Sequence, residues 1–242
     1  MHGWPDCHNI WDKYIDHYSK THRCITYDMP NFGQKPESFN WGYDLDELTD
    51  MIAMTLKESL EKENKQSCIL VTHDWGAVLG SMLFRKFPHL VEKVVQHEVE
   101  IQKWEARPNF GLFVFGLIAG VIYQWMNALG LIIASIPVVG IPIATKLQHF
   151  VTCNTNAPLC QDEQGRQRTN PMMNYPYLWF TVYSFAECFG LRKGFDARHG
   201  IRAEDVKKVP TMFVYKTPWF HSKKFEQEMR DREDCDVVRL IG

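Results

Sequence analysis

The chain has 242 residues, of which 45% are hydrophobic and 23% are charged, and its formal net charge is −2. This apolar content is sufficient for a sizeable core and excludes an intrinsically disordered chain. The nearly balanced charge, with no basic stripe, excludes a nucleic-acid-binding surface. We therefore expect a globular protein, built either as one large domain or as a core with an insertion, with no nucleic acid among its partners.

The seven cysteines are scattered, and no pair has C-x-x-C spacing. An odd number without that spacing favours reduced thiols inside the cell over a disulfide framework or a zinc site, although Cys153 and Cys160 are close enough to remain an exception. We accordingly expect no metal and no cofactor. The first residues contain neither a positive region nor an apolar region, so we expect no signal peptide and an intracellular location, cytoplasmic or membrane-associated.

Strand-like and helix-like patterns alternate along the first hundred residues. From 44 to 62, leucines and isoleucines recur at helical spacing, with acids early and lysines late. Short β-prone or apolar runs predict strands at 23–28, 67–72 and 93–99, and a second helix is predicted at 76–87. This alternation indicates a parallel sheet with helices on both faces.

The middle third interrupts this order. Residues 108–145 contain no Asp, Glu, Lys or Arg, but glycines, prolines and polar residues interrupt the apolar run. We favour an apolar cap that lines a hydrophobic tunnel or lies on a membrane surface over a membrane-spanning helix. The alternation resumes with a predicted strand at 210–216, a helix at 222–232 and a strand at 236–241, so the middle third is interpreted as an insertion between two halves of one sheet.

The most informative segment runs from Val71 to Ala77, between a predicted strand and a predicted helix. Its middle residue, Asp74, occupies the position of the nucleophile in a strand–turn–helix elbow, where small neighbours such as Gly76 allow close approach. Thr72 is larger than the glycine usual at its position. A carboxylate at the elbow attacks an electrophilic carbon and forms an alkyl-enzyme ester. The alternative is an ordinary N-cap, with Asp74 capping the helix.

Two earlier loops extend this pattern. His2-Gly3-Trp4-Pro5 resembles the HGxP turn of epoxide hydrolases, and the segment from Asp28 to Gly33 resembles their D-x-P-G-x-G loop, with Asn31 in place of a glycine. With the elbow, these motifs follow the family's order and spacing. The chain therefore resembles the α/β-hydrolase superfamily, in particular epoxide hydrolases, and is also similar to haloalkane dehalogenases. The resemblance covers residues 1–100 and 201–242 well and the middle loosely.

The resemblance implies an α/β fold of the α/β-hydrolase type, with a mostly parallel sheet and a helical cap insertion. We expect the first part of the core at 1–104, the cap at 105–200 and the second part of the core at 201–242. The family's first three strands have no counterpart here, so we expect a chain shortened at both ends. The 23–28 strand would then lack a neighbour, and we expect a partial gene product or abnormal pairing of that strand.

The resemblance also assigns roles to residues. Asp74 would be the nucleophile, and the N–H groups of Trp4 and Trp75 would form the oxyanion hole. His2 and Gly3 belong to the same turn as Trp4. The cap tyrosines expected to donate to an epoxide oxygen, or simply to pack on the core, are Tyr123, Tyr175 and Tyr177.

The remaining members of a catalytic triad are harder to place. Glu98, with Glu100 as fallback, is the candidate acid that would orient a histidine, unless Glu98 is only a solvated carboxylate at the end of a strand. The family's histidine lies in a loop after the last strand, and none of the ten histidines here occupies that place. We assign no catalytic histidine, and whether the chain is an enzyme stays open.

Three functions follow from these assignments. The first is epoxide hydrolase-like hydrolysis of an apolar small molecule, in which Asp74 forms an ester that water later hydrolyses. The second is haloalkane dehalogenase-like hydrolysis by the same route. The third is a non-catalytic α/β-hydrolase-like scaffold or subunit, which the missing histidine favours. The sequence leaves the substrate and the oligomeric state open.

Overall fold

The computed structural model describes residues 1–32, 41–99, 110–151, 170–202, 209–216 and 223–240. The chain divides into two compact units. The first, here called the sheet unit, consists of Met1, Leu45–Ala106 and Gly190–Gly242. The second, here called the helical unit, consists of His2–Asp44 and Arg107–Phe189.

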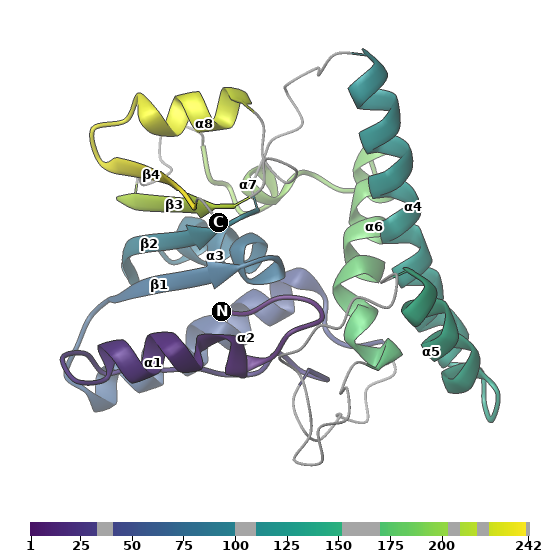
Figure 1. Ribbon diagram of the computed structural model, residues 1–242, viewed down its shortest axis with the longest axis horizontal. Helices are drawn as coiled ribbons and strands as arrows, with labels where there is room; N and C mark the ends of the chain where they lie inside the picture. The colour runs from purple at the N-terminus through teal and green to yellow at the C-terminus, as the bar shows by residue number, and fades with distance from the viewer. Residues whose placement is uncertain (33–40, 100–109, 152–169, 203–208, 217–222, 241–242) are drawn as a thin grey trace. The chain divides into compact units, whose positions relative to one another are not determined.

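The sheet unit contains a four-stranded parallel sheet in the order β1-β2-β3-β4 (Figure 1). Its strands are β1 (Cys68–His73), β2 (Val91–His97), β3 (Thr211–Tyr215) and β4 (Cys235–Arg239). His73 lies opposite His97, and His97 lies opposite Val214, so the carboxyl ends of the first three strands meet at one edge. The predicted parallel sheet is confirmed, and its two halves are joined although more than a hundred residues separate β2 from β3.

Helices of the sheet unit bury the apolar faces that the sequence predicts. They are α2 (Leu45–Lys62), α3 (Trp75–Lys86), α7 (Phe195–Arg198) and α8 (Lys223–Arg230). α3 packs on β1 and β2, α2 packs on α3, and α8 packs on β4. Leu79 and Leu83 of α3 are completely buried, and Phe213 of β3 is buried against Met229 of α8. Burial of these side chains is the main force that holds the helices on the sheet.

A cluster of charged side chains fixes the segment 190–202 to the start of α2. The Asp46 carboxylate accepts hydrogen bonds or ion pairs from Arg192, Arg198 and His199. Three donors share this one half-buried carboxylate. The cluster therefore fixes the position of segment 190–202 on α2 as well as contributing to the stability of the fold.

The helical unit is built around three helices, α4 (Phe110–Ala134), α5 (Gly140–Val151) and α6 (Tyr175–Cys188) (Figure 1). Three short helices, η1 (His8–Trp11), α1 (Asp12–Tyr18) and η2 (Pro171–Asn174), complete it. Gly140 allows the tight α4–α5 turn, because a Cβ there would lie 2.2 Å from the Ile133 carbonyl oxygen. Among the helices in the described part of the chain, none is long and apolar enough to cross a membrane.

Residues 23–28 do not form the predicted strand, and that prediction is wrong. The structure describes them as irregular backbone outside the sheet. At the outer edge of β1 lies instead the backbone of Met1, whose amino group donates to the Val71 carbonyl at 2.5 Å and whose carbonyl accepts from the His73 N–H at 3.0 Å. A β-prone segment without an adjacent strand has no ladder to join.

The unit boundaries differ from the boundaries expected from the sequence. Residues 2–44, expected in the core, cluster with 107–189. Aromatic side chains explain the difference. The Trp179 indole donates to the Trp41 carbonyl at 3.0 Å, and the Tyr175 ring lies so close to Gly42 that a Cβ there would be 2.2 Å from it. These contacts join residues 41 and 42 to α6 within the helical unit.

Candidate active site

Asp74 joins β1 to α3 in a backbone conformation that is costly for any residue with a side chain. Its φ is 52° and its ψ is −126°. This is outside the left-handed helical region that Asn and Asp tolerate, and such a residue costs about 1–3 kcal/mol. Although Asp74 occupies the N-cap position of α3, its carboxylate makes no capping hydrogen bond to the helix. The geometry therefore favours the strained strand–turn–helix elbow over the ordinary helix cap.

Close packing of β1 against α3 supports this turn. A Cβ at Gly80 would lie 2.9 Å from Cγ2 of Thr72 and 3.2 Å from Cδ2 of Leu70, so any larger residue there would force these side chains to move. Thr72 replaces the small residue usual before an elbow, and Gly80 accommodates its methyl group. Trp75, directly after Asp74, begins α3 and is buried. Its backbone N–H belongs to the first turn of the helix, where amides point toward developing negative charge.

Glu98 lies at the same edge of the sheet as Asp74. Each residue directly follows one of the paired strand-end histidines, His73 and His97, and Glu98 also has a positive φ, 65°. The Glu98 N–H donates to the Val214 carbonyl at 2.8 Å, which anchors its backbone on β3. The sheet thus brings two half-exposed carboxylates, Asp74 and Glu98, to one edge. The fallback acid, Glu100, lies outside the described residues.

His97 is a feature of this edge that no sequence motif indicates. Burial, with a smaller contribution from His73 beside it, lowers the pKa of His97 to about 4. At neutral pH its imidazole is therefore uncharged. In the sequence, His97 is distinguished only as a polar residue at the end of an apolar strand.

In the helical unit, His2 holds the HGxP-like turn against the loop that begins at Asp28. His2 Nε2 accepts from the Met29 N–H at 3.0 Å, which places the ring proton on Nδ1, where it donates to the Gly3 carbonyl at 3.1 Å. Burial lowers the pKa of His2 to about 4, so the ring is neutral. The Gly3 carbonyl also accepts from the Asp6 N–H at 2.9 Å. His2 and Gly3 therefore hold the turn in its conformation. The lone pair on His2 Nε2 already accepts the Met29 N–H.

Trp4, in the same turn, lies in an aromatic group with two of the three candidate tyrosines. Its ring packs edge-on against Tyr123 and Tyr177, with centroids 6.0 and 5.5 Å apart, and its indole N–H donates to the Asn174 side-chain oxygen at 2.8 Å. The hydroxyls of Tyr123 and Tyr177 are 2.8 Å apart. Asn174, which no sequence motif indicates, fixes the Trp4 ring.

Tyr175 behaves differently from the other two tyrosines. It is completely buried, packs edge-on against Phe32 and covers Gly42. The structure thus brings Tyr123 and Tyr177 together and uses the Tyr175 ring in packing.

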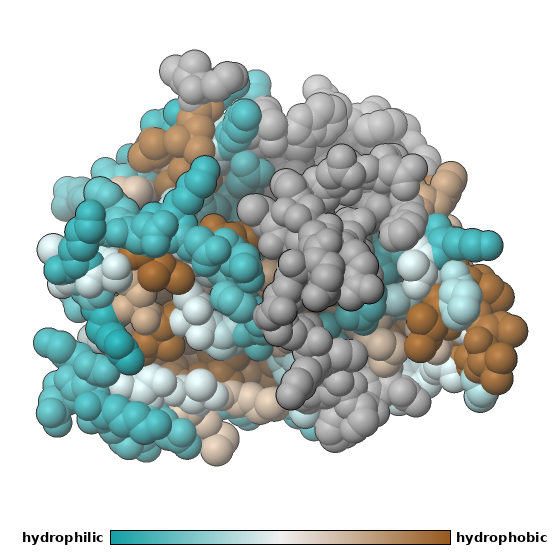
Figure 2. Space-filling model, turned by 60° about the horizontal axis from the view of Figure 1, so that its bottom comes forward, coloured by the Kyte–Doolittle hydropathy of each residue, from teal (hydrophilic) through white to brown (hydrophobic). Residues whose placement is uncertain are grey.

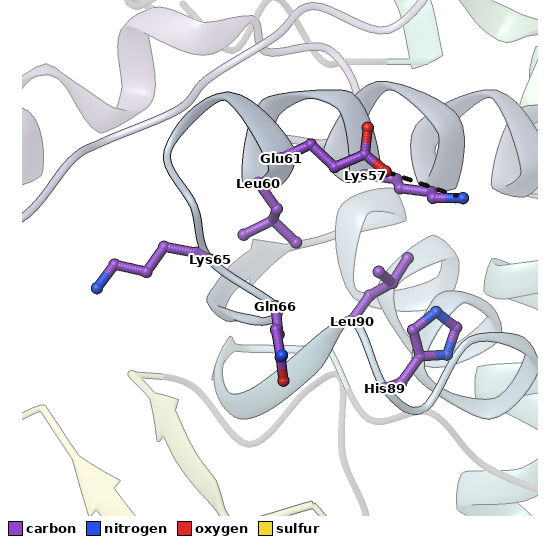
Figure 3. Close-up of a pocket in the computed structure, with 7 residues that line it drawn as sticks. All are labelled: Lys57, Leu60, Glu61, Lys65, Gln66, His89 and Leu90. Atoms are coloured by element: carbon purple, nitrogen blue, oxygen red, sulfur yellow. Dashed lines mark ion pairs between the residues drawn. The ribbon is translucent and has the colours of Figure 1, made fainter.

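A surface pocket of about 310 Å³ occurs elsewhere in the sheet unit (Figure 3). It is lined by Lys57, Leu60, Glu61, Lys65, Gln66, His89 and Leu90. Gln66 and Leu90 precede β1 and β2, so the pocket lies at the amino ends of the strands. Asp74 and Glu98 lie at the carboxyl ends, where open α/β sheets bind their ligands. The pocket therefore belongs to the edge opposite the candidate nucleophile.

Comparison with known proteins agrees with this geometry. The family model described as alpha/beta hydrolase fold matches residues 1–115. Epoxide hydrolase 1 of Caenorhabditis elegans is 27% identical over 97 residues, which cover 39% of this chain and 23% of that protein. The chain thus spans about a quarter of the length of the curated relative that it matches.

Solved structures show the same fold over nearly the whole chain. A mutant of an epoxide hydrolase from Bacillus megaterium gives a TM-score of 0.64 at 19% identity, covering 99% of this chain and 83% of that one. A loop variant of a haloalkane dehalogenase from Bradyrhizobium elkanii gives 0.62 at 18% identity, covering 99% and 79%. The chain is therefore an α/β-hydrolase-fold protein. Over 97 residues it is also similar to the epoxide hydrolase of Caenorhabditis elegans, the class of protein that the sequence motifs resemble.

Proposed function

We propose that this chain carries the nucleophile of an epoxide hydrolase-like enzyme and that Asp74 is that nucleophile. The observation that supports this most is the conformation of Asp74. Its backbone is strained, and its side chain makes no capping hydrogen bond to α3. Backbone strain of this size persists only where the surrounding structure enforces it, and it concentrates at functional sites. A carboxylate at the elbow performs covalent catalysis on carbon, because it is a weak base but a competent nucleophile when held in line.

A carboxylate oxygen of Asp74 forms a bond to an epoxide carbon, and the bond between that carbon and the ring oxygen breaks. The ring oxygen leaves as an alkoxide and takes a proton from a tyrosine hydroxyl. The pair formed by Tyr123 and Tyr177 supports this role, because their hydroxyls lie 2.8 Å apart and either can act as a hydrogen-bond donor. Trp75 and Trp4 are the proposed oxyanion N–H donors during ester hydrolysis.

Hydrolysis of the ester needs a base that activates water, and Glu98 is the proposed acid that would orient such a base. No histidine in the described segments matches the family's position for it. An apolar substrate is proposed from the composition of the cap.

Single-turnover trapping tests the proposal. The chain is incubated with an excess of an aryl epoxide, digested and examined by mass spectrometry for a hydrolysable adduct on the peptide that contains Asp74. Wild type should be labelled once, and Asp74→Ala should not be labelled. Glu98→Gln should still be labelled, because Glu98 acts only in the second step. An unlabelled wild-type chain with native circular dichroism would favour the non-catalytic scaffold.

The dehalogenase-like alternative is tested in the same assay with a primary alkyl bromide. The position of Trp75 after the nucleophile allows this reading, because an indole N–H there can hold a leaving halide, but a tryptophan at this position does not discriminate between the two reactions. The tyrosine pair favours the epoxide, since a halide leaves without a proton. Labelling by the bromide alone would overturn the epoxide assignment and retain Asp74.

A second proposal concerns a lipid surface. The turn between α4 and α5 exposes aliphatic side chains, which form the brown surface at the right edge of Figure 2. They are Ile136, Val138, Val139, Ile141 and Ile143. Val138 is 95% exposed, so the turn projects outward, and no acidic residue occurs in 108–145 to repel anionic headgroups. A projecting aliphatic turn suits insertion between lipids, whereas protein interfaces favour aromatic residues and arginine. We accordingly propose that this turn contacts a membrane surface and that the protein is an intracellular one associated with that membrane.

A further inference from the structure

Three metal-binding side chains meet at the beginning of η1, in the helical unit. Cys7 and His8 come from the chain just after the HGxP-like turn, and Asp28 comes from the loop that His2 holds beside it. One donor atom from each residue, a thiol sulfur, an imidazole nitrogen and a carboxylate oxygen, lies within 4.8 Å of the other two. Cys7 is only 2% exposed, whereas the side chain of His8 is 38% exposed.

The three residues are held in place by backbone and side-chain contacts. The His8 N–H donates to Asp28 Oδ1 at 2.7 Å, and His8 Nδ1 lies 2.8 Å from Asp28 Oδ2. The Cys7 thiol lies 3.2 Å from the side-chain oxygen of Asn9, to which it donates. His2 Nε2 is 3.6 Å from Asp28 Oδ1, but it accepts the Met29 N–H and so is not available as a fourth ligand.

We propose that Cys7, His8 and Asp28 bind one divalent ion of the zinc class. Thiolate, imidazole and carboxylate together suit Zn²⁺ or Co²⁺ and do not suit Mg²⁺ or Ca²⁺, which take oxygen ligands. On binding, the Cys7 thiol releases its proton to solvent and its sulfur bonds to the ion. The proton of His8 that the Asp28 carboxylate accepts in the free protein moves through solvent from Nδ1 to Nε2, so that the Nδ1 lone pair can bond to the ion. The thiolate and the carboxylate together balance the two positive charges. Water occupies the fourth tetrahedral position.

The distances are compatible with such a site. With bonds of about 2.0 Å to nitrogen and oxygen and about 2.3 Å to sulfur, tetrahedral ligand atoms lie roughly 3.3–3.6 Å apart. Donor atoms within 4.8 Å of one another need only small side-chain rotations to reach this separation. The hydrogen bond between His8 and Asp28 must lengthen by about half an ångström for the same geometry. The partly exposed His8 ring provides both the freedom to move and a path for the ion.

Cysteine spacing alone does not reveal this site. Cys7 has no second cysteine near it in the sequence, and the third donor follows twenty residues later along the chain. The sequence therefore predicts no metal, and the cluster becomes visible only when the Asp28 loop folds against η1. An ion there would join these two segments and would stabilise the turn that contains Trp4.

Cobalt spectroscopy on the full chain tests the proposal independently of catalysis. Co²⁺ is titrated into reduced, chelator-treated protein, and absorbance is followed in the near ultraviolet and the visible. We expect one ion per chain, a thiolate-to-cobalt charge-transfer band, intense visible bands typical of tetrahedral cobalt, and competition by Zn²⁺. Saturation without a thiolate band, or no stoichiometric binding, would overturn the site.

Matched variants locate the ion. Loss of a residue that only orients a ligand costs about 10–100-fold in affinity, so loss of a ligand should cost at least about 100-fold. Cys7→Ser and His8→Gln should each show this loss for Zn²⁺, and Cys7→Ser should also lose the charge-transfer band. Cys24→Ser and His22→Gln, which change the same residue types outside the cluster, should change the affinity by less than about threefold.

If Cys7→Ser folds poorly, His8→Gln still tests the site, because His8 is partly exposed and its substitution should leave the fold intact. Binding by His8→Gln at wild-type affinity would contradict the proposal, as would an equal loss in the two control variants. A chain that binds Zn²⁺ at Cys7 but forms no ester at Asp74 would separate this inference from the proposed function.

Discussion

At the scale of single residues, the strain at Asp74 is a quantity that can be measured. We expect Asp74→Gly to be more stable than Asp74→Ala by about 1 kcal/mol. Glycine relieves a strain of about 1–3 kcal/mol, and its greater chain entropy offsets about 0.5–1 kcal/mol of that gain. Urea unfolding of both variants measures the difference, and both should lose ester formation. Equal stability of the two variants would mean that the Asp74 backbone is not strained.

The buried His2 and the half-buried His97 should make the protein less stable in acid. His97 and His2 both have pKa values lowered to about 4, against about 6.5 in the unfolded chain. Between pH 6.5 and 4 the unfolded state therefore binds more protons than the folded state, and the free energy of unfolding rises with pH. Stability from these groups is present above pH 6.5 and is lost as the pH falls toward 4.

The variant that isolates His97 is His97→Gln, which keeps a polar side chain that does not titrate. Thermal unfolding measured between pH 4 and pH 7 should show a smaller slope for His97→Gln than for wild type. His22→Gln, on an exposed side chain, should leave the slope unchanged. A variant slope as steep as that of wild type would assign the acid sensitivity to other groups.

At the scale of elements, the contact between β1 and α3 positions the elbow. Gly80→Ala adds a methyl group 2.9 Å from Cγ2 of Thr72. Overpacking of this kind costs about 1–3 kcal/mol, more than the roughly 1 kcal/mol that alanine gains over glycine inside a helix. We expect Gly80→Ala to be destabilised overall, by about 1 kcal/mol in urea unfolding.

A second substitution shows whether the clash is the cause. Thr72→Ser removes Cγ2, so in that background Gly80→Ala should recover most of the loss. Gly194→Ala is the control, because a Cβ at Gly194 meets nothing within 4 Å, and it should change stability by less than about 0.5 kcal/mol. Purely additive effects at positions 72 and 80 would contradict the argument.

The elements that the sequence predicts correctly are those whose burial depends on local pattern. The apolar run at 67–72 becomes β1, and the helical spacing from 44 to 62 becomes α2, each within a residue or two. The 23–28 segment has equal local propensity but is not a strand, because a strand needs a neighbour and propensity does not provide one. The charge-free stretch similarly predicts burial or membrane contact without indicating the turn at Gly140 that divides it into α4 and α5.

In the candidate site, too, the sequence predicts what depends on local pattern and does not predict what depends on contacts formed in the folded chain. The position of Asp74 between a strand and a helix is a local pattern, and the motif alone identifies it. Its lack of a capping bond and its ψ are properties of the folded turn. The tyrosine pair depends on contacts between residues more than fifty positions apart, so the sequence offers three equivalent tyrosines and only packing distinguishes Tyr175 from the other two.

At the scale of the whole molecule, the projecting α4–α5 turn predicts how the protein distributes between water and lipid. Inserting a valine or isoleucine side chain into an apolar environment contributes about 1.5–3 kcal/mol, so several such side chains are sufficient for reversible binding. Val138→Asp removes one contribution and adds a charge that must be desolvated. We expect this substitution to weaken binding to phosphatidylcholine–phosphatidylserine vesicles at least about 10-fold in a sedimentation assay.

The control for this assay is Leu191→Asp, a change at an apolar side chain that is 82% exposed and belongs to the sheet unit. It introduces the same charge and should leave vesicle binding within about twofold of wild type, because scattered exposed apolar residues carry no interface. Equal losses in both variants would point to net charge as the cause. A different result would be a wild-type protein that does not bind vesicles but forms dimers, with Val138→Asp disrupting those dimers. The turn would then bind a second copy of the chain, because the same aliphatic surface would be buried against protein instead of lipid.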